Sequence, residues 1–140
     1  MKNYKLVIIA LACLLLISAG CSTDKDVKAN LGEEFSLNIG QTVRIASEDL
    51  EIEFIDVTED SRCPKGVTCI WEGRVSCLVE ITYRGSLDSV VLTEPGLTNF
   101  PPEQSFHEYK LVYHIEPYPQ AGAEIAEEEY QLQLKISKEY

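Results

Sequence analysis

Positive charge is scarce in this sequence. Only 12 Lys and Arg residues stand against 23 Asp and Glu, which gives a formal net charge of −11 over 140 residues. A chain of this charge is repelled by nucleic acid phosphates and by anionic lipid headgroups. We therefore expect no nucleic acid partner, and any attachment to a membrane would come from a lipid rather than from a basic face.

Long helical patterns and catalytic motifs are also missing. Outside the first 20 residues no extended window keeps the apolar spacing of a helix, and the nearest stretch allows one helical turn at 124–129. The sequence contains no Gly-x-Ser-x-Gly, no His-Glu-x-x-His and no glycine-rich phosphate loop. We therefore predict that the protein is not an enzyme and carries no cofactor.

Histidine is scarce, and its placement argues against a metal site. His107 and His114 are seven positions apart, which puts them on opposite faces of a continuous strand, unless His107 lies in the loop before the strand. The acidic runs at 48–53 and 127–129 lack the alternating oxygen ligands of a calcium loop. We predict no metal site. A small metal-dependent envelope enzyme is the alternative, and it would require two or more of His107, His114, Cys77 and an acid to converge in one pocket.

An apolar run near the N-terminus is the clearest signal that the sequence does contain. Lys2 and Lys5 precede apolar residues 6–17, and small residues then lead to Cys21. The run is shorter than the about 20 residues that span a bilayer, so we interpret it as a secretory signal. It resembles a bacterial lipoprotein signal, which implies removal of residues 1–20 and transfer of a diacylglyceryl group to the Cys21 thiol. An ordinary signal peptide cleaved at the same place is the alternative.

This interpretation divides the chain into three parts. Residues 1–20 are the signal peptide, 21–33 form a lipidated flexible tether, and 34–140 form a single domain. We expect a lipoprotein of the bacterial cell envelope, anchored to a membrane by palmitate at its N-terminus, with the domain outside the cytoplasm.

The sequence of the domain is typical of an all-β protein. Short alternating runs are separated by Gly, Pro, Asp and Ser, as they are between antiparallel strands. The alternation changes phase after Phe54, which indicates a bulge near Phe54 or a strand buried on both faces. We predict one antiparallel β-sandwich, or a small barrel, of about seven strands. The predicted strands are 34–38, 41–46, 50–58, 74–83, 87–93, 109–116 and 129–137.

Cysteine usage fits an exported domain. Of five cysteines, Cys13 would leave with the signal and Cys21 would carry lipid. Cys63 and Cys69 are the closest remaining pair, and the Pro and Gly between them let the chain turn back. We expect this pair to form a disulfide bond and Cys77 to be a free thiol on the buried face of its strand. A bridge from Cys77 to either neighbour is the alternative.

The most unusual motif surrounds this pair. It consists of Ser61-Arg62-Cys63-Pro64, then Cys69-Ile70-Trp71, then Gly73. The motif resembles an element of small, uncharacterised bacterial lipoproteins and exported proteins, and the resemblance extends loosely to Pro117-Tyr118-Pro119. It implies a fold type and an export route, but no activity.

Two functions follow for this stretch. In the first, it is a structural staple in which Gly66 and Gly73 allow positive φ and Trp71 packs over the bridge or the sheet edge. The protein would then be a lipid-anchored binding or structural module with an envelope protein as partner. In the second, the braced 62–72 loop is a protease inhibitor or another recognition element with Lys65 at its tip. The recognition residues would be Arg62, Pro64, Lys65, Gly66 and Trp71.

Overall fold

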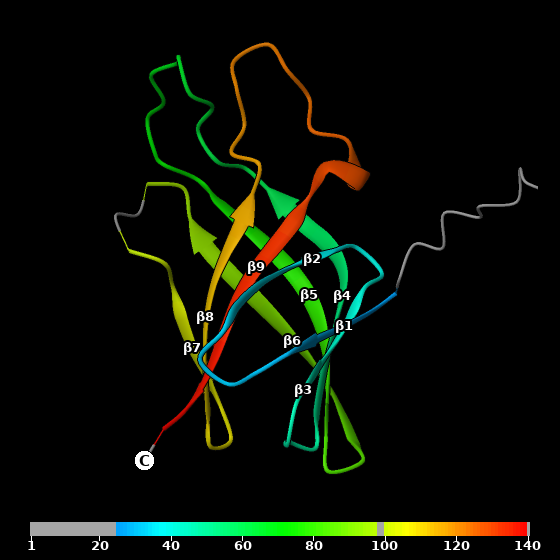
Figure 1. The fold of residues 1–140 in the computed structure, drawn as a ribbon. Coiled ribbons are helices and arrows are strands. Elements are labelled where there is room, and N and C mark those ends of the chain that lie inside the picture. Colours follow the sequence, from blue (N-terminus) through cyan, green and yellow to red (C-terminus); the bar gives the residue numbers. More distant parts are fainter. Residues whose placement is uncertain (1–24, 98–99, 140) are drawn as a thin grey trace, which may run out of the picture.

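The protein is a two-layer β-sandwich, which confirms the predicted fold class. A computed structural model describes residues 25–97 and 100–139, and in this part of the chain nine strands form sheets of five and four strands (Figure 1). The first sheet has the order β1-β3-β4-β5-β6 and the second β2-β9-β8-β7. The elements are β1 (Asp26–Ala29), β2 (Glu34–Asn38), β3 (Thr42–Ile45), β4 (Leu50–Asp60), β5 (Arg74–Tyr83), β6 (Ser86–Pro95), β7 (Glu103–Phe106), β8 (Tyr109–Glu116), the 3₁₀ helix η1 (Glu127–Glu129) and β9 (Gln131–Lys138).

All seven predicted strands are present, with ends that differ by no more than two residues. The predicted bulge is confirmed, because the β4–β5 register shifts between Phe54 and Asp56 and again between Val57 and Glu59. The helical turn expected at 124–129 is the short 3₁₀ helix η1.

The predicted tether is wrong for residues 26–29. These residues form β1, which pairs in parallel with β3 and is the one exception to the antiparallel pairing of the described strands. Alternation is hard to detect in a strand of four residues, and only Ala29 is buried. The predicted signal peptide and Cys21 lie outside the described residues.

The core lies between the sheets and comes from side chains that alternate inward along each strand. In β9, Leu132, Leu134 and Ile136 are buried, whereas Gln131 is exposed. Each fully buried aliphatic side chain of this size stabilises the fold by about 1.5–3 kcal/mol. Cys77 belongs to the same core and is a free thiol, as predicted.

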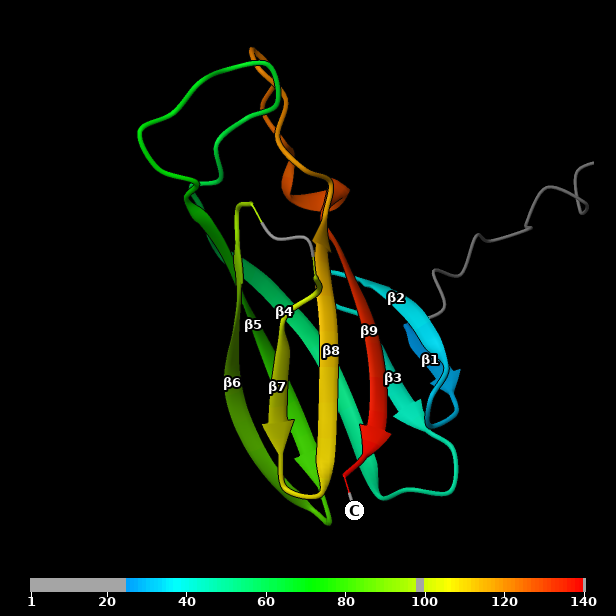
Figure 2. The same cartoon turned by 90° about the vertical axis from the view of Figure 1, so that its left-hand side faces the viewer.

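The two ends of the sandwich differ. Tight hairpins close one end, whereas the long connections 61–73 and 117–130, and the described parts of the connection after β6 (96–97 and 100–102), lie at the other (Figures 1 and 2). We call the second end the loop end. No helix in the described ranges is long and apolar enough to cross a membrane.

Candidate recognition surface

Arg62 is the buried centre of the loop end. Its side chain is 1% exposed, and its Nε and Nη2 donate to the two carboxylate oxygens of Asp60 at 2.8 and 2.6 Å. Nη1 and Nη2 also donate to the carbonyl oxygens of Ile115 (2.8 Å) and Pro117 (2.9 Å). A buried guanidinium is tolerated when it is paired and its donors are used, and both conditions hold here. Arg62 therefore joins the end of β4 to the end of β8.

Tyr118 extends this network to the neighbouring loops. Its ring lies 5.0 Å from the Arg62 guanidinium carbon, and its hydroxyl is within hydrogen-bond distance of the carbonyl oxygens of Cys63 (3.0 Å) and Gly96 (2.8 Å). On the other side, the Tyr130 hydroxyl donates to Asp60 at 3.0 Å. Burial, together with the nearby Asp60 charge, raises the pKa of Tyr130 to about 12. All three long connections are thus held to one polar centre.

The predicted Cys63–Cys69 disulfide is confirmed, with Cα atoms 5.9 Å apart. The Cys63 amide also donates to the Glu72 carbonyl at 2.9 Å, so the loop is closed at its base by a backbone bond. Gly66 and Gly73 have φ values of 91° and 71°, as expected for turns that only glycine forms without strain.

Lys65 is not a free tip, contrary to what the inhibitor hypothesis requires. Its amide donates to the Pro119 carbonyl at 3.0 Å, and its carbonyl accepts from the Ala121 amide at 3.1 Å. Its Nζ lies 5.3 Å from the centre of the Tyr118 ring. The segment around Lys65 is therefore already paired with the connection that follows β8.

Arg62 and Trp71 are placed differently from their predicted roles. Arg62 is buried and holds the loop in place, so it is not a recognition residue. Trp71 is 80% exposed and does not cover the bridge. The loop closes on itself beyond the ends of β4 and β5, which keeps this side chain outside the reach of the core.

Other exposed apolar side chains accompany Trp71. Ile70 is 99% exposed, and Val67 is also open to solvent. Leu97 is exposed as well, and it follows Gly96, which packs so closely on the Glu72 backbone that a Cβ there would lie 2.0 Å from the Glu72 carbonyl oxygen. Leu97 is thus carried on a segment adjacent to Trp71. We call Val67, Ile70, Trp71 and Leu97 the apolar loop surface.

The two histidines do not converge, and His107 lies in the turn before β8 rather than on one continuous strand with His114. His107 lies in the β7–β8 turn with φ of 51°, and its ring centre is 4.8 Å from that of Tyr83. His114 lies towards the loop end of β8, with Nδ1 2.5 Å from a Glu94 carboxylate oxygen. Among the described residues, no group of three or more His, Cys, Asp or Glu side chains is arranged to hold a metal ion.

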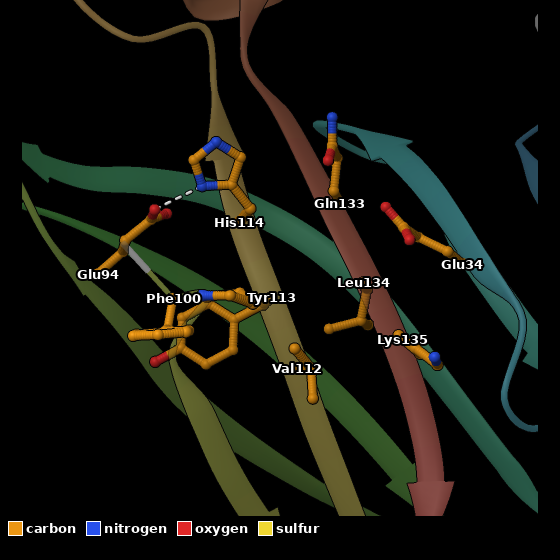
Figure 3. A pocket seen from close by; sticks show the side chains of 10 residues that line it. Glu34, Glu94, Phe100, Val112, Tyr113, His114, Gln133, Leu134 and Lys135 are labelled. Atoms are coloured by element: carbon orange, nitrogen blue, oxygen red, sulfur yellow. Dashed lines mark hydrogen bonds and ion pairs between the residues drawn. The ribbon is translucent and has the colours of Figure 1, made fainter. Parts of the chain in front are cut away.

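A groove of about 500 Å³ lies beside His114 (Figure 3). His114, Val112, Gln133 and Lys135 come from β8 and β9, and Glu34 lies across on β2. The groove is lined by Glu34, Glu94, Phe100, Pro101, Val112, Tyr113, His114, Gln133, Leu134 and Lys135. Only His114 among these residues is a candidate site residue from the sequence, because the lining comes from four strands and a loop that no local pattern connects.

Glu94 and Tyr113 join the two sheets beside this groove. The Glu94 carboxylate accepts from the Ile115 amide of β8 at 2.8 Å. In return, the Tyr113 hydroxyl accepts from the Thr93 amide of β6 at 3.2 Å and donates to the Thr93 carbonyl at 2.9 Å. Each side chain therefore satisfies backbone groups that have no neighbouring strand: β6 is the last strand of its sheet, and β7 pairs with β8 only as far as Val112.

Comparison with family models, with curated proteins and with solved structures finds no match for this chain.

Proposed function

We propose that the protein is a lipid-anchored module of the bacterial cell envelope that binds a partner protein through the apolar loop surface. The observation that carries this proposal is the exposure of Ile70 and Trp71, at 99% and 80%, on a loop held by a disulfide. Exposed Trp and large aliphatic side chains are costly in water, and Trp is enriched among the residues that dominate binding energy.

The bracing of the loop supports the same function. The disulfide, the Arg62 network and the backbone bonds of Lys65 all fix the loop before any partner binds. A surface that is already ordered loses less conformational entropy on binding. Inhibition of a protease through Lys65 has less support, because its backbone is already hydrogen-bonded to residues 119 and 121.

The lipid anchor is proposed from the resemblance of residues 1–21 to a lipoprotein signal. Since β1 begins at Asp26, only residues 22–25 would separate Cys21 from the sandwich. Five peptide links of fully extended chain reach at most about 18 Å. A lipidated Cys21 would therefore hold the sandwich close to the bilayer. Cys21→Ala is expected to abolish palmitate labelling and to leave the precursor uncleaved, and labelling that survives would refute the anchor.

Site-specific photocrosslinking in the producing cell tests the binding surface. A photoreactive amino acid at position 70 or 71 is expected to give a discrete adduct with one envelope protein. The same amino acid at Ala46, which is exposed in the hairpin between β3 and β4 at the other end, is the matched control and should not give that adduct. No adduct at positions 70 and 71, or the same adduct at position 46, would contradict the proposal.

A further inference from the structure

The outer edge of β6 has no strand beside it in the described structure. β6 is the last strand of the five-stranded sheet and forms one side of the molecule in Figure 2. Ten consecutive residue pairs, from Tyr83–Ser86 to Arg74–Pro95, align β6 with β5 without a register shift. The edge is therefore long and regular, which is the geometry that accepts a further strand.

The hydrogen-bonding groups of this edge can be assigned to particular residues. The β5–β6 hairpin has a turn of two residues, Arg84 and Gly85, both with positive φ, so Tyr83 and Ser86 form a hydrogen-bonded pair. The backbone groups of every second residue of β6, beginning at Leu87, then point away from β5. Thr93 agrees with this phase, because its amide and carbonyl meet the Tyr113 hydroxyl.

Leu87, Ser89 and Val91 share this outward phase. No hydrogen bond of their outward backbone groups is found among the described residues, and all three are exposed. Leu87 and Val91 are 60% and 53% exposed, on the outer face of the sheet. The edge also lacks the usual protection, since residues 86–94 contain no Lys, no Pro and no bulge.

We propose that this edge pairs with β6 of a second copy of the chain, antiparallel and centred on Ser89. In that register Ser89 faces Ser89 of the other copy, and Leu87 faces Val91. Each of these pairs is of the hydrogen-bonded type, so all outward amides and carbonyls from Leu87 to Val91 find partners. The two apolar side chains also meet on the outer face. A two-fold axis produces both contacts from one surface, as an isologous dimer requires.

The charge of the molecule limits the strength of this dimer. A net charge of −11 per chain makes two copies repel each other. The edge itself contributes little to that repulsion, because Asp88 would face Val90 of the other copy rather than Asp88. One strand pair buries less surface than a standard interface. The association is therefore weak and depends on local concentration.

Cysteine crosslinking of the purified full-length chain tests both the partner and the register. The Cα atoms of a hydrogen-bonded antiparallel pair lie about 5.5 Å apart, within the range of a disulfide. Under copper–phenanthroline oxidation, Ser89→Cys is expected to give a covalent dimer above the background of the unsubstituted chain. Leu87→Cys alone and Val91→Cys alone should stay at background, because equal positions other than 89 lie roughly 13 Å apart along the strand. Differently tagged Leu87→Cys and Val91→Cys chains, when mixed, should crosslink to each other.

Adding Leu87→Pro to Ser89→Cys gives a variant that removes the edge hydrogen bond of the Leu87 amide and also shortens the apolar side chain that would meet Val91 of the other copy. The Leu87 amide does not bond to β5, and proline is tolerated on edge strands, so the fold is spared. The dimer yield should fall roughly tenfold, since each copy loses one intermolecular hydrogen bond. A Ser89→Cys chain that remains monomeric would overturn the proposal. Equal crosslinking at positions 87, 89 and 91 would also overturn it, because that pattern indicates random collision.

Discussion

Arg62 uses its guanidinium to satisfy a carboxylate and two backbone carbonyls at the end of the sandwich. We expect Arg62→Met to lower the free energy of unfolding by about 3–5 kcal/mol, because it leaves the Asp60 charge unpaired in a site that water barely reaches. Arg74→Met is the control, since the Arg74–Glu59 pair is similar in type but its Arg side chain is 60% exposed. That change should cost at most about 1 kcal/mol. Urea unfolding measures both, and equal effects would contradict the role given to Arg62.

Gly73 shows how closely the loop base is packed. A Cβ at this position would lie 1.9 Å from the Ser61 carbonyl oxygen, and the residue also has φ of 71°. We expect Gly73→Ala to destabilise the fold by at least about 3 kcal/mol, since both steric overlap and backbone strain oppose it. Gly85→Ala provides the comparison, because Gly85 has φ of 78° but no atom within 4 Å of the added carbon. It should cost only about 1–2 kcal/mol. A Gly73→Ala chain as stable as Gly85→Ala would contradict this prediction, because the backbone at Ser61 would then have moved away from the added carbon at little cost.

At the scale of elements, the Tyr113 hydroxyl makes two of the hydrogen bonds that join β6 to β8, beside those of Glu94. Tyr113→Phe removes both hydrogen bonds to Thr93 and should cost about 1–3 kcal/mol, because the Thr93 amide and carbonyl lose their partner. Amide hydrogen exchange gives the sharper readout. The Thr93 amide should exchange faster in the variant, whereas the Leu92 amide, which faces Cys77 on β5, should remain protected. Unchanged protection at Thr93 would contradict the assignment.

The sequence predicted those elements whose side chains alternate over several residues. β8 buries every second side chain from Tyr109 to Ile115, β9 does so from Leu132 to Ile136, and both were predicted as strands. β7 was missed because none of its four residues is buried, so the sequence carries no alternation that a core would impose. β1 was missed because it is equally short and because it pairs with β3 rather than with β2, the next strand in the sequence.

The loop end was only partly predictable, for a related reason. The Cys63–Cys69 bridge follows from local spacing and was identified. The partners of Arg62 at Ile115 and Pro117 are 53 and 55 residues away, and no periodic pattern links them. Trp71 was expected to pack because large aromatic side chains usually do. Its exposure depends on where the loop projects, which is set by those distant partners.

At the scale of the whole molecule, the end of the sandwich opposite the loop end contains two hydrogen bonds between a tyrosine and a glutamate. Tyr109 donates to Glu48 at 2.6 Å, and Tyr83 donates to Glu108 at 2.7 Å. Lys138 also contacts Glu48 at 2.9 Å. Hydrogen bonds from Lys138 and then Tyr109 lower the pKa of Glu48, and the hydrogen bond from Tyr83 lowers the pKa of Glu108. This end therefore depends on two carboxylates that stay ionised in the folded protein.

These lowered pKa values predict how stability responds to acid. A carboxylate whose folded pKa lies below its unfolded pKa stabilises the fold fully above the unfolded value, about 4.3 for Glu. That contribution disappears as the pH falls through the folded pKa. Wild type should therefore exceed the Glu48→Gln, Glu108→Gln double variant in Tm at pH 7, and the difference should shrink towards zero on acidification to pH 3. Asp49→Asn, which removes an exposed charge next to Glu48 but neither of these hydrogen bonds, controls for the relief of general repulsion in this acidic chain. A difference that grows at low pH would mean that these carboxylates destabilise the folded state.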